Sequence, residues 1–282
     1  MSPADGDPRP PEADLGAGFL CRTVDGSADA LRATVEIDRA SPWFAGHFPG
    51  DPILPAIGQL DLLHRLRIHR GRPSHLAAVD TLRLAEPVRP GDVLRVELVP
   101  PSPDGRSAVA LTRSAGGPVS RGTVRWADET AAIPEEPADS PATGPRPAAT
   151  AVPPLPHAPP ARFVREVLEA TADHALCRGF VPPDHASVTA GRSPSLAALE
   201  LAAQSAAALD PDSPAPSIGY IVRLRSVTFP TPTLPAATPL LARIRRDTRH
   251  GPLTLLTFEV TLAENRKKLL AKGVLGVYLP ER

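Results

Sequence analysis

The chain has 282 residues, with 31 Lys and Arg balanced by 31 Asp and Glu, which excludes a general polyanion-binding protein because such proteins need a basic surplus. The longest apolar runs fall far short of the about 20 residues that a membrane-spanning helix requires, and the first 14 residues have neither a basic start nor an apolar core. With only two cysteines, no disulfide framework is available, and we expect a cytoplasmic protein with no membrane segment and no secretory signal.

The first half of the chain predicts two short strands, one helix and then four strands. Short strands are expected over 18–24 and 31–38, followed by a loop rich in Pro and Gly. Apolar side chains recur at helical spacing from Ile57 to Leu66, and Pro55 is well placed to start that helix. Four strand-like runs follow, with Pro-Gly, Asp-Gly and Gly-Gly turns between them: 75–88, 92–99, 107–114 and 118–126.

A stretch without hydrophobic periodicity then extends from about residue 127 to residue 161. Pro, Ala, Glu and Thr dominate it, which is typical of a semi-extended linker. A structureless loop of this length is unusual inside one compact domain. We therefore predict an N-terminal domain over 15–127, a linker over 128–161 and a C-terminal domain over 162–282.

The second half repeats the order of the first. Strands are expected over 163–170 and 175–181, a helix over 195–209, and four more strands after it. This internal duplication is the main organisational feature of the chain. Each half contains several strands for one helix, so the helix packs against one sheet face and the fold class is α+β.

The segment Phe44–Pro55 carries the strongest candidate for chemistry. His47 lies in a stretch with three prolines and two glycines, which makes the loop stiff and holds the imidazole in place. The loop leads into a helix, whose first backbone N–H groups are free to polarise a carbonyl and stabilise a developing enolate. A histidine near neutral pH can remove an activated C–H proton.

The sequence GHFPGDPILP, with Asp61 fourteen residues after His47, resembles the hotdog-fold 3-hydroxyacyl-[acyl carrier protein] dehydratases. The following LPAIGQLD is similar to the dehydratases of aryl-polyene-type clusters. The resemblance implies a double hotdog, in which each half has a long central helix wrapped by an antiparallel β-sheet. It also implies dehydration by a histidine and a carboxylate. The chain departs from the family at Ala56, where Gly is usual.

A second carboxylate occupies the corresponding place in the second half. Aligning Pro194 with Pro55 places Glu200 opposite Asp61, and Gln204 lies four residues on, so that both share one helix face. A solvated polar pair is the alternative, but the neighbouring residues are almost all apolar. Burial raises the pKa of a carboxylate, which suits a general acid.

The same alignment places Ala186 opposite His47, with His185 one position away. We favour the interpretation that the second half has lost the catalytic histidine and kept the acid; participation of His185 is the alternative. In homodimeric relatives, the resemblance implies that each site combines a histidine from one hotdog with a carboxylate from its neighbour. We therefore expect His47 to face Glu200 in one competent site, and the mirrored site containing Asp61 to be inactive.

The expected reaction is elimination of water from a 3-hydroxyacyl thioester in a fatty-acid, aryl polyene or polyketide pathway. His47 removes the C2 proton, and Glu200 protonates the departing hydroxyl, directly or through a water held with Gln204. Asp61 is kept as the alternative carboxylate. N–H groups near Gly50 and Ala56 hold the thioester oxygen. Predicted substrate contacts come from the loop and the two helices: Phe48, Gly50, Pro55, Ala56 and Gln204.

No Cys/His metal spacing is present, so we expect neither a metal nor another cofactor, and an acyl group carried on the phosphopantetheine of an acyl carrier protein. The two halves are expected to form a pseudo-dimer within the chain, and further homodimerisation stays open. Arg223 and Arg225, with the basic runs 243–249 and 266–268, are either a docking surface for an acidic carrier or, as we favour, solvated strand faces and turns. Six histidines without a partner pattern are interpreted as surface or structural: His64, His69, His75, His157, His174 and His250.

Two other functions compete with dehydration. Hotdog thioesterases share the expected fold, and product analysis separates free acid from enoyl thioester. A non-catalytic acyl-carrier-binding subunit is the third possibility, because the second histidine is missing. A non-catalytic function would be supported if His47 lay far from both Asp61 and Glu200.

Overall fold

The computed structural model describes residues 12–128, 152, 154–209 and 218–280. The predicted α+β class is confirmed: two helices pack against a largely antiparallel sheet. The elements of the first half, in chain order, are β1 (Ala13–Asp14), β2 (Phe19–Ser27), β3 (Ala30–Ile37), a 3₁₀ turn (Pro42–Phe44), α1 (Ala56–His69), β4 (Ser74–Leu84), β5 (Val93–Leu98), β6 (Arg106–Arg113) and β7 (Pro118–Asp128).

The second half repeats this order with a shorter helix. Its elements are β8 (Val164–Ala170), β9 (His174–Gly179), β10 (Arg192–Pro194), a 3₁₀ turn (Ser195–Ala197), α2 (Ala198–Ser205), a second 3₁₀ turn (Ala206–Leu209), β11 (Tyr220–Thr228), β12 (Thr233–Pro235), β13 (Leu240–His250), β14 (Leu253–Leu262) and β15 (Leu269–Tyr278). The sequence pattern did not predict β1, β10 and β12, which have only two or three residues each.

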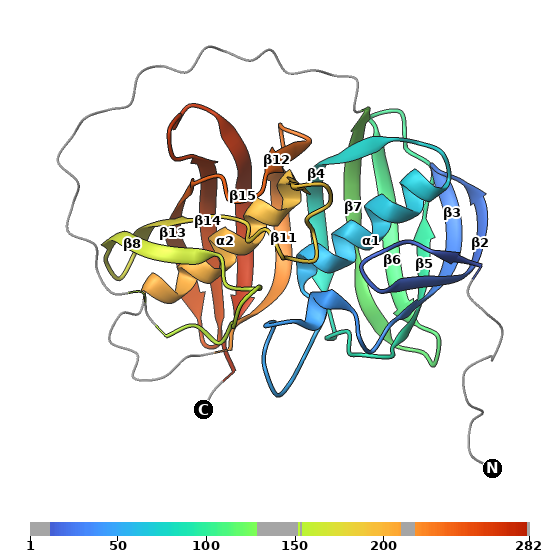
Figure 1. The fold of residues 1–282 in the computed structure, drawn as a ribbon, viewed down its shortest axis with the longest axis horizontal. Helices are drawn as coiled ribbons and strands as arrows, with labels where there is room; N and C mark the ends of the chain where they lie inside the picture. Colours follow the sequence, from blue (N-terminus) through green and yellow to red (C-terminus); the bar gives the residue numbers. More distant parts are fainter. Residues whose placement is uncertain (1–11, 129–151, 153, 210–217, 281–282) are drawn as a thin grey trace.

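One sheet of thirteen strands joins the two halves. Its order is β1-β2-β3-β5-β6-β7-β4-β11-β15-β14-β13-β9-β8, and the strands on either side of the β4–β11 pair correspond to one another. Strands β4 and β11 are antiparallel, with Leu224 opposite Leu82. Figure 1 shows α1 and α2 following one another across one face of this continuous sheet. The duplication read from the sequence is therefore a structural pseudo-symmetry.

Helix α1 is buried along most of its length, because the sheet of its own half curves around it. Ile57, Leu60 and Leu66 have no exposed surface, and they belong to the same apolar core as the inward residues of the strands. Helix α2 is equally buried, with Leu199 and Leu201 fully enclosed. No helix in the described parts of the chain is long and apolar enough to span a membrane.

The loop that carries His47 packs against a segment from the far side of the predicted linker. Residues 154–161 are ordered against this loop, and the Ala158 N–H donates a hydrogen bond of 2.9 Å to the Gly46 carbonyl. A Cβ on Gly46 would lie 2.1 Å from the Ala158 carbonyl oxygen, and the φ of Gly46 is +74°. Glycine is therefore required here for the two segments to approach. The larger part of the predicted linker, 129–151 with residue 153, lies outside the described residues.

Candidate active site

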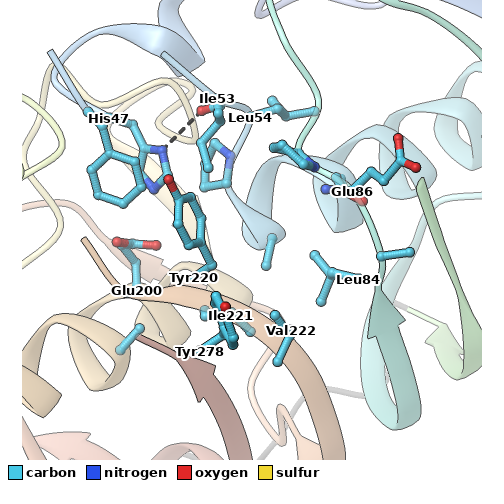
Figure 2. A pocket seen from close by; sticks show the side chains of 18 of the residues that line it. His47, Ile53, Leu54, Leu84, Glu86, Glu200, Tyr220, Ile221, Val222 and Tyr278 are labelled. Carbon is cyan, nitrogen blue, oxygen red and sulfur yellow. Dashed lines mark hydrogen bonds between the residues drawn. The ribbon is translucent and has the colours of Figure 1, made fainter. Parts of the chain in front are cut away.

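His47 lies near the start of the stiff loop, and its side chain is held by one hydrogen bond. Its Nδ1 is 3.0 Å from the Ile53 carbonyl oxygen, so Nδ1 carries the proton and Nε2 has a free lone pair (Figure 2). The side chain is 6% exposed. Burial lowers the pKa of His47 from 6.5 to about 4, against the opposing effect of Glu200. The imidazole is therefore neutral at physiological pH, as a proton acceptor must be.

Glu200 lies on α2 in the other half of the chain and is fixed by Gln204. The Gln204 Nε2 donates to Glu200 Oε1 at 2.9 Å and to the Ala161 carbonyl at 2.6 Å. The Gln204 Oε1 accepts from the Phe163 N–H at 2.8 Å, which ties α2 to the start of β8. Glu200 is 4% exposed and Gln204 3% exposed, so this network is buried.

The expectation that burial would leave Glu200 with a raised pKa was wrong. Burial does act upward, but the hydrogen bond and charge of His157, the charge of His47 and the hydrogen bond from Gln204 outweigh it and lower the pKa from 4.5 to about 2. Helical periodicity shows that Glu200 is buried, but it does not show which donors tertiary folding brings to the carboxylate. Glu200 is therefore an ionised carboxylate at neutral pH.

His157 is the residue of the site that the sequence analysis missed. Its interpretation as a surface residue was wrong, because the side chain is only 8% exposed and its Nε2 lies 3.3 Å from Glu200 Oε1. Its ring centroid lies 5.2 Å from that of His47 and 4.9 Å from that of Phe48. The signal in the sequence was weak: apolar residues such as Leu155 and Phe163 interrupt the proline-rich run around it.

A cavity of about 320 Å³ opens beside His47, His157 and Glu200. Figure 2 shows His47 and Glu200 at this cavity. Its walls are mostly apolar and come from both halves, including Leu84 of β4 and Ile221 of β11. The start of α1 also contributes, since Pro55 and Ala56 line the cavity. The first N–H groups of a helix have no partner within it, so the cavity has hydrogen-bond donors near its polar end.

Among the other predicted substrate contacts, the structure places Phe48 in the cavity wall but not Gly50. Phe48 has a φ of +36°, a strained conformation for a bulky residue that the packed loop imposes. Gly50 has a φ of +93° with open space around it, so it shapes the turn rather than touching the cavity. Gln204 acts behind Glu200 and lines a smaller neighbouring cavity of about 120 Å³.

The structure does not bring Asp61 to His47. Asp61 lines a different cavity, where its carboxylate accepts a hydrogen bond of 2.5 Å from Arg65 Nε. Burial raises the pKa of Asp61, and the adjacent Arg65 opposes this. His185 is also buried: its Nδ1 is 2.8 Å from the Ser187 hydroxyl and its ring packs edge-on against Trp43 and Phe163. His185 is thus a packed core residue beside the mirrored position.

His47, His157 and Glu200 are also the residues with which this site could hold a metal ion, since one donor atom of each lies within 4.8 Å of the others. Glu200 Oε1 already has two hydrogen-bond donors, from His157 and Gln204. The carboxylate is therefore ordered by these two hydrogen bonds.

Fold and site together define a double-hotdog protein with one histidine and one carboxylate facing each other across the junction of its halves. Comparison with known families agrees with this description: residues 23–123 match the ApeI-like family, described as ApeI dehydratase, and residues 150–282 match the ApeP-like family, described as ApeP dehydratase. The chain belongs to the hotdog-fold dehydratases and carries two of their units in tandem.

The curated relatives are matched over part of their length. A 3-hydroxyacyl-[acyl-carrier-protein] dehydratase FabZ of Thermomicrobium roseum is 35% identical over 65 residues, which is 20% of this chain and 44% of the relative. The FabZ of Chloroflexus aggregans is 40% identical over 65 residues, 20% of this chain and 45% of the relative. The chain thus spans less than half of the length of these relatives.

Solved structures match over nearly the whole chain. The dehydratase domain from the CurJ module of the curacin polyketide synthase has a TM-score of 0.64 at 13% identity, covering 95% of this chain and 99% of that domain. The dehydratase domain of PpsC from Mycobacterium tuberculosis, in complex with C12:1-CoA, has a TM-score of 0.60 at 16% identity, covering 94% and 98%. At this identity the likeness establishes the double-hotdog fold.

Proposed function

We propose that the protein dehydrates a 3-hydroxyacyl thioester to the 2-enoyl thioester, in a fatty-acid, aryl polyene or polyketide pathway. The observation that carries this proposal is the position of neutral His47 within 4.8 Å of Glu200, at the polar end of an apolar cavity formed by both halves. The FabZ relatives, named as 3-hydroxyacyl-[acyl-carrier-protein] dehydratases, support the same reaction.

The elimination begins at His47. Its Nε2 takes the C2 proton of the substrate, while Nδ1 stays hydrogen-bonded to the Ile53 carbonyl and keeps the ring oriented. The first N–H groups of α1, at Ala56 and Ile57, stabilise the negative charge that develops on the thioester oxygen. Glu200 faces the C3 hydroxyl of the substrate, which departs and takes up a proton.

The substrate is an acyl group on the phosphopantetheine of an acyl carrier protein. The mostly apolar cavity suits an acyl chain, and the exposed residues Glu86, Pro87 and Tyr278 form its mouth. Carrying the substrate on the partner requires neither a metal nor another cofactor in the protein. Because one chain supplies both His47 and Glu200, the intrachain pseudo-dimer contains a complete site; a further homodimer is not required for catalysis. A cytoplasmic location is part of the same proposal.

A row of arginines next to the mouth supports a carrier-docking role. Arg223 of β11 is directly opposite Arg83 of β4, and Arg83 is directly opposite Arg121 of β7. All three are exposed, and the positions that flank the row are Gly276 and Ala110. Like charges directly opposite each other destabilise a sheet. An acidic partner offsets that repulsion, so we assign this row to carrier docking, extending the sequence-based candidate Arg223.

The test is incubation of the purified protein with a 3-hydroxyacyl thioester, with mass-spectrometric identification of the product. We expect 2-enoyl thioester from the wild-type protein, in the presence of a chelator as well, and none from His47→Ala. Formation of free acid would instead identify a thioesterase. Absence of any conversion of several acyl-chain lengths by the wild-type protein would favour a non-catalytic carrier-binding subunit.

A further inference from the structure

His157 occupies a position in the site that the two-residue mechanism leaves unused. Its Nε2 lies 3.3 Å from Glu200 Oε1, and its ring packs against both His47 and Phe48. Within the described residues, its Nδ1 is buried and has no hydrogen-bond partner. His157 also lines the substrate cavity. A buried ring nitrogen without a hydrogen-bond partner costs folding free energy, so its presence here calls for a functional explanation.

Glu200 needs such a neighbour to act as an acid. An ionised carboxylate can accept a proton but has none to give, and Glu200 is ionised at neutral pH for the reasons given above. The other polar contact of its Oε1 is Gln204, whose carboxamide does not titrate. His157 is therefore the group in contact with Glu200 that can hold a transferable proton.

We propose that His157 and Glu200 act together as the acid of this site, sharing the proton that leaves with the substrate hydroxyl. The inference rests on the proposed dehydratase function. It adds a third functional residue, contributed by the segment between the two hotdog units rather than by either helix. Gly46 makes this possible, because its missing side chain lets residues 157–159 approach the His47 loop.

The proton and electron balance is simple. Before reaction, the His157–Glu200 pair holds one transferable proton between His157 Nε2 and Glu200 Oε1. His47 Nε2 takes the C2 proton, the C2–H electron pair becomes the C2=C3 bond, and the C3–O bond breaks. The shared proton passes through Glu200 to the departing oxygen, which leaves as water. His47 is now protonated, and the His157–Glu200 pair has given up its proton.

The same geometry returns the site to its starting state. One ring nitrogen of His47 lies within 4.8 Å of one ring nitrogen of His157, a separation that one water molecule beside the rings can bridge. The proton taken from C2 can therefore return to the His157–Glu200 pair inside the cavity, without exchange through bulk solvent.

A substrate whose leaving group needs no proton tests this inference. We compare the N-acetylcysteamine thioesters of 3-hydroxyoctanoate and 3-chlorooctanoate, because chloride leaves without protonation. For His157→Phe, loss of general-acid catalysis is expected to slow water elimination at least about 100-fold while leaving chloride elimination within about fivefold of wild type. His47→Ala is expected to lose both reactions. His157→Gln keeps an N–H donor for Glu200 but cannot relay a proton, so it should behave like His157→Phe.

His174→Gln is the matched control, since His174 forms an exposed pair with Glu169 at 2.8 Å, remote from the site, and should retain both activities. Full dehydration by His157→Gln would overturn the inference and leave His157 as a hydrogen-bond donor alone. An equal loss of both eliminations in both His157 variants would also overturn it, since it indicates a structural role. If wild-type protein eliminates no water from any 3-hydroxyacyl thioester, the proposed function itself fails.

Discussion

Replacing Glu200 and Asp61 with their amides, one at a time, tests which of the two carboxylates serves the active site. Both donors to Glu200, from His157 and Gln204, converge on Oε1. In Glu200→Gln, the amide oxygen can take that place, so the network survives and only the charge and the proton chemistry are lost. Asp61→Asn likewise keeps an oxygen acceptor for Arg65 Nε in a cavity that His47 does not line.

The magnitudes follow from these contacts. Removing a general acid costs about 100- to 10,000-fold in rate, equivalent to about 2.7 to 5.4 kcal/mol in the barrier. For Glu200→Gln, two hydrogen bonds lose their charge assistance while the buried charge is relieved, so we expect the free energy of unfolding to change by less than about 2 kcal/mol. Asp61→Asn is expected to keep the dehydration rate within about threefold, because it leaves the acid of the site in place.

The assay is steady-state formation of the 2-enoyl thioester, followed by its ultraviolet absorbance, with thermal unfolding of each variant measured in parallel. Loss of activity in Asp61→Asn together with tolerance of Glu200→Gln would refute the intrachain pairing. It would mean instead that N-terminal halves pair between two chains. Loss of activity accompanied by loss of the folded state in either variant would refute the local hydrogen-bond argument.

Four further predictions follow from the same geometry. Because His47 must be neutral and its pKa is lowered to about 4, kcat/KM should stay level on its base limb down to about pH 5 and fall below about pH 4; an apparent base pKa near 6.5 would refute this. Burial also lowers the pKa of His185 to about 4, so below about pH 6.5 the unfolded chain protonates His47 and His185 while the folded chain does not. Thermal melts should therefore show stability decreasing from about pH 6.5 toward pH 4. A flat profile would contradict the burial of two neutral histidines. Gln204→Leu leaves the Phe163 N–H and the Ala161 carbonyl unpaired in the core and should lower the free energy of unfolding, measured by urea titration, by about 2 to 5 kcal/mol. Ser205→Ala is the comparison: it loses one hydrogen bond to Leu201 and should cost about 1 kcal/mol. Arg83→Glu combined with Arg223→Glu should raise KM about tenfold or more for a carrier-bound substrate and leave the N-acetylcysteamine thioester unaffected, and an equal change for both substrates would dismiss the docking row.

Local patterns were sufficient to predict most of the secondary structure. The helix expected from Ile57 to Leu66 lies within α1, and its start after Pro55 is correct. Strands expected over 163–170 and 175–181 correspond to β8 and β9. Alternating or helical spacing of apolar residues depends on backbone period alone, so it can be read without knowing the partners. Strands of two or three residues carry no period and were missed.

The duplication also determined which residues correspond in the two halves. The offset of 139 residues places Glu200 in the second helix at the position of Asp61 in the first, and both are buried. The structure then brings Glu200 to His47 and pairs Asp61 with Arg65. Sequence alone left this choice open, because it depends on how the two sheets join through β4 and β11.

His157 shows the limit of a local reading most clearly. A histidine among prolines has no periodicity, and its segment resembles a linker up to the point where it packs against Gly46 and Glu200. The direction of the pKa shift of Glu200 was missed for the same reason. The apolar pattern of its helix predicts burial, but the hydrogen-bond donors to the carboxylate include His157, which lies elsewhere in the chain.

The repeated order of elements thus determined the α+β duplication by itself, and the resemblance of the GHFPGDPILP segment implied the class of protein, because periodicity and motifs are properties of short segments. Tertiary structure alone decided that His47, His157 and Glu200 share one buried site, because those contacts join residues separated by 43 to 153 positions in the chain. The ionisation of a buried group depends on such contacts, and so does the proton chemistry that the site can perform.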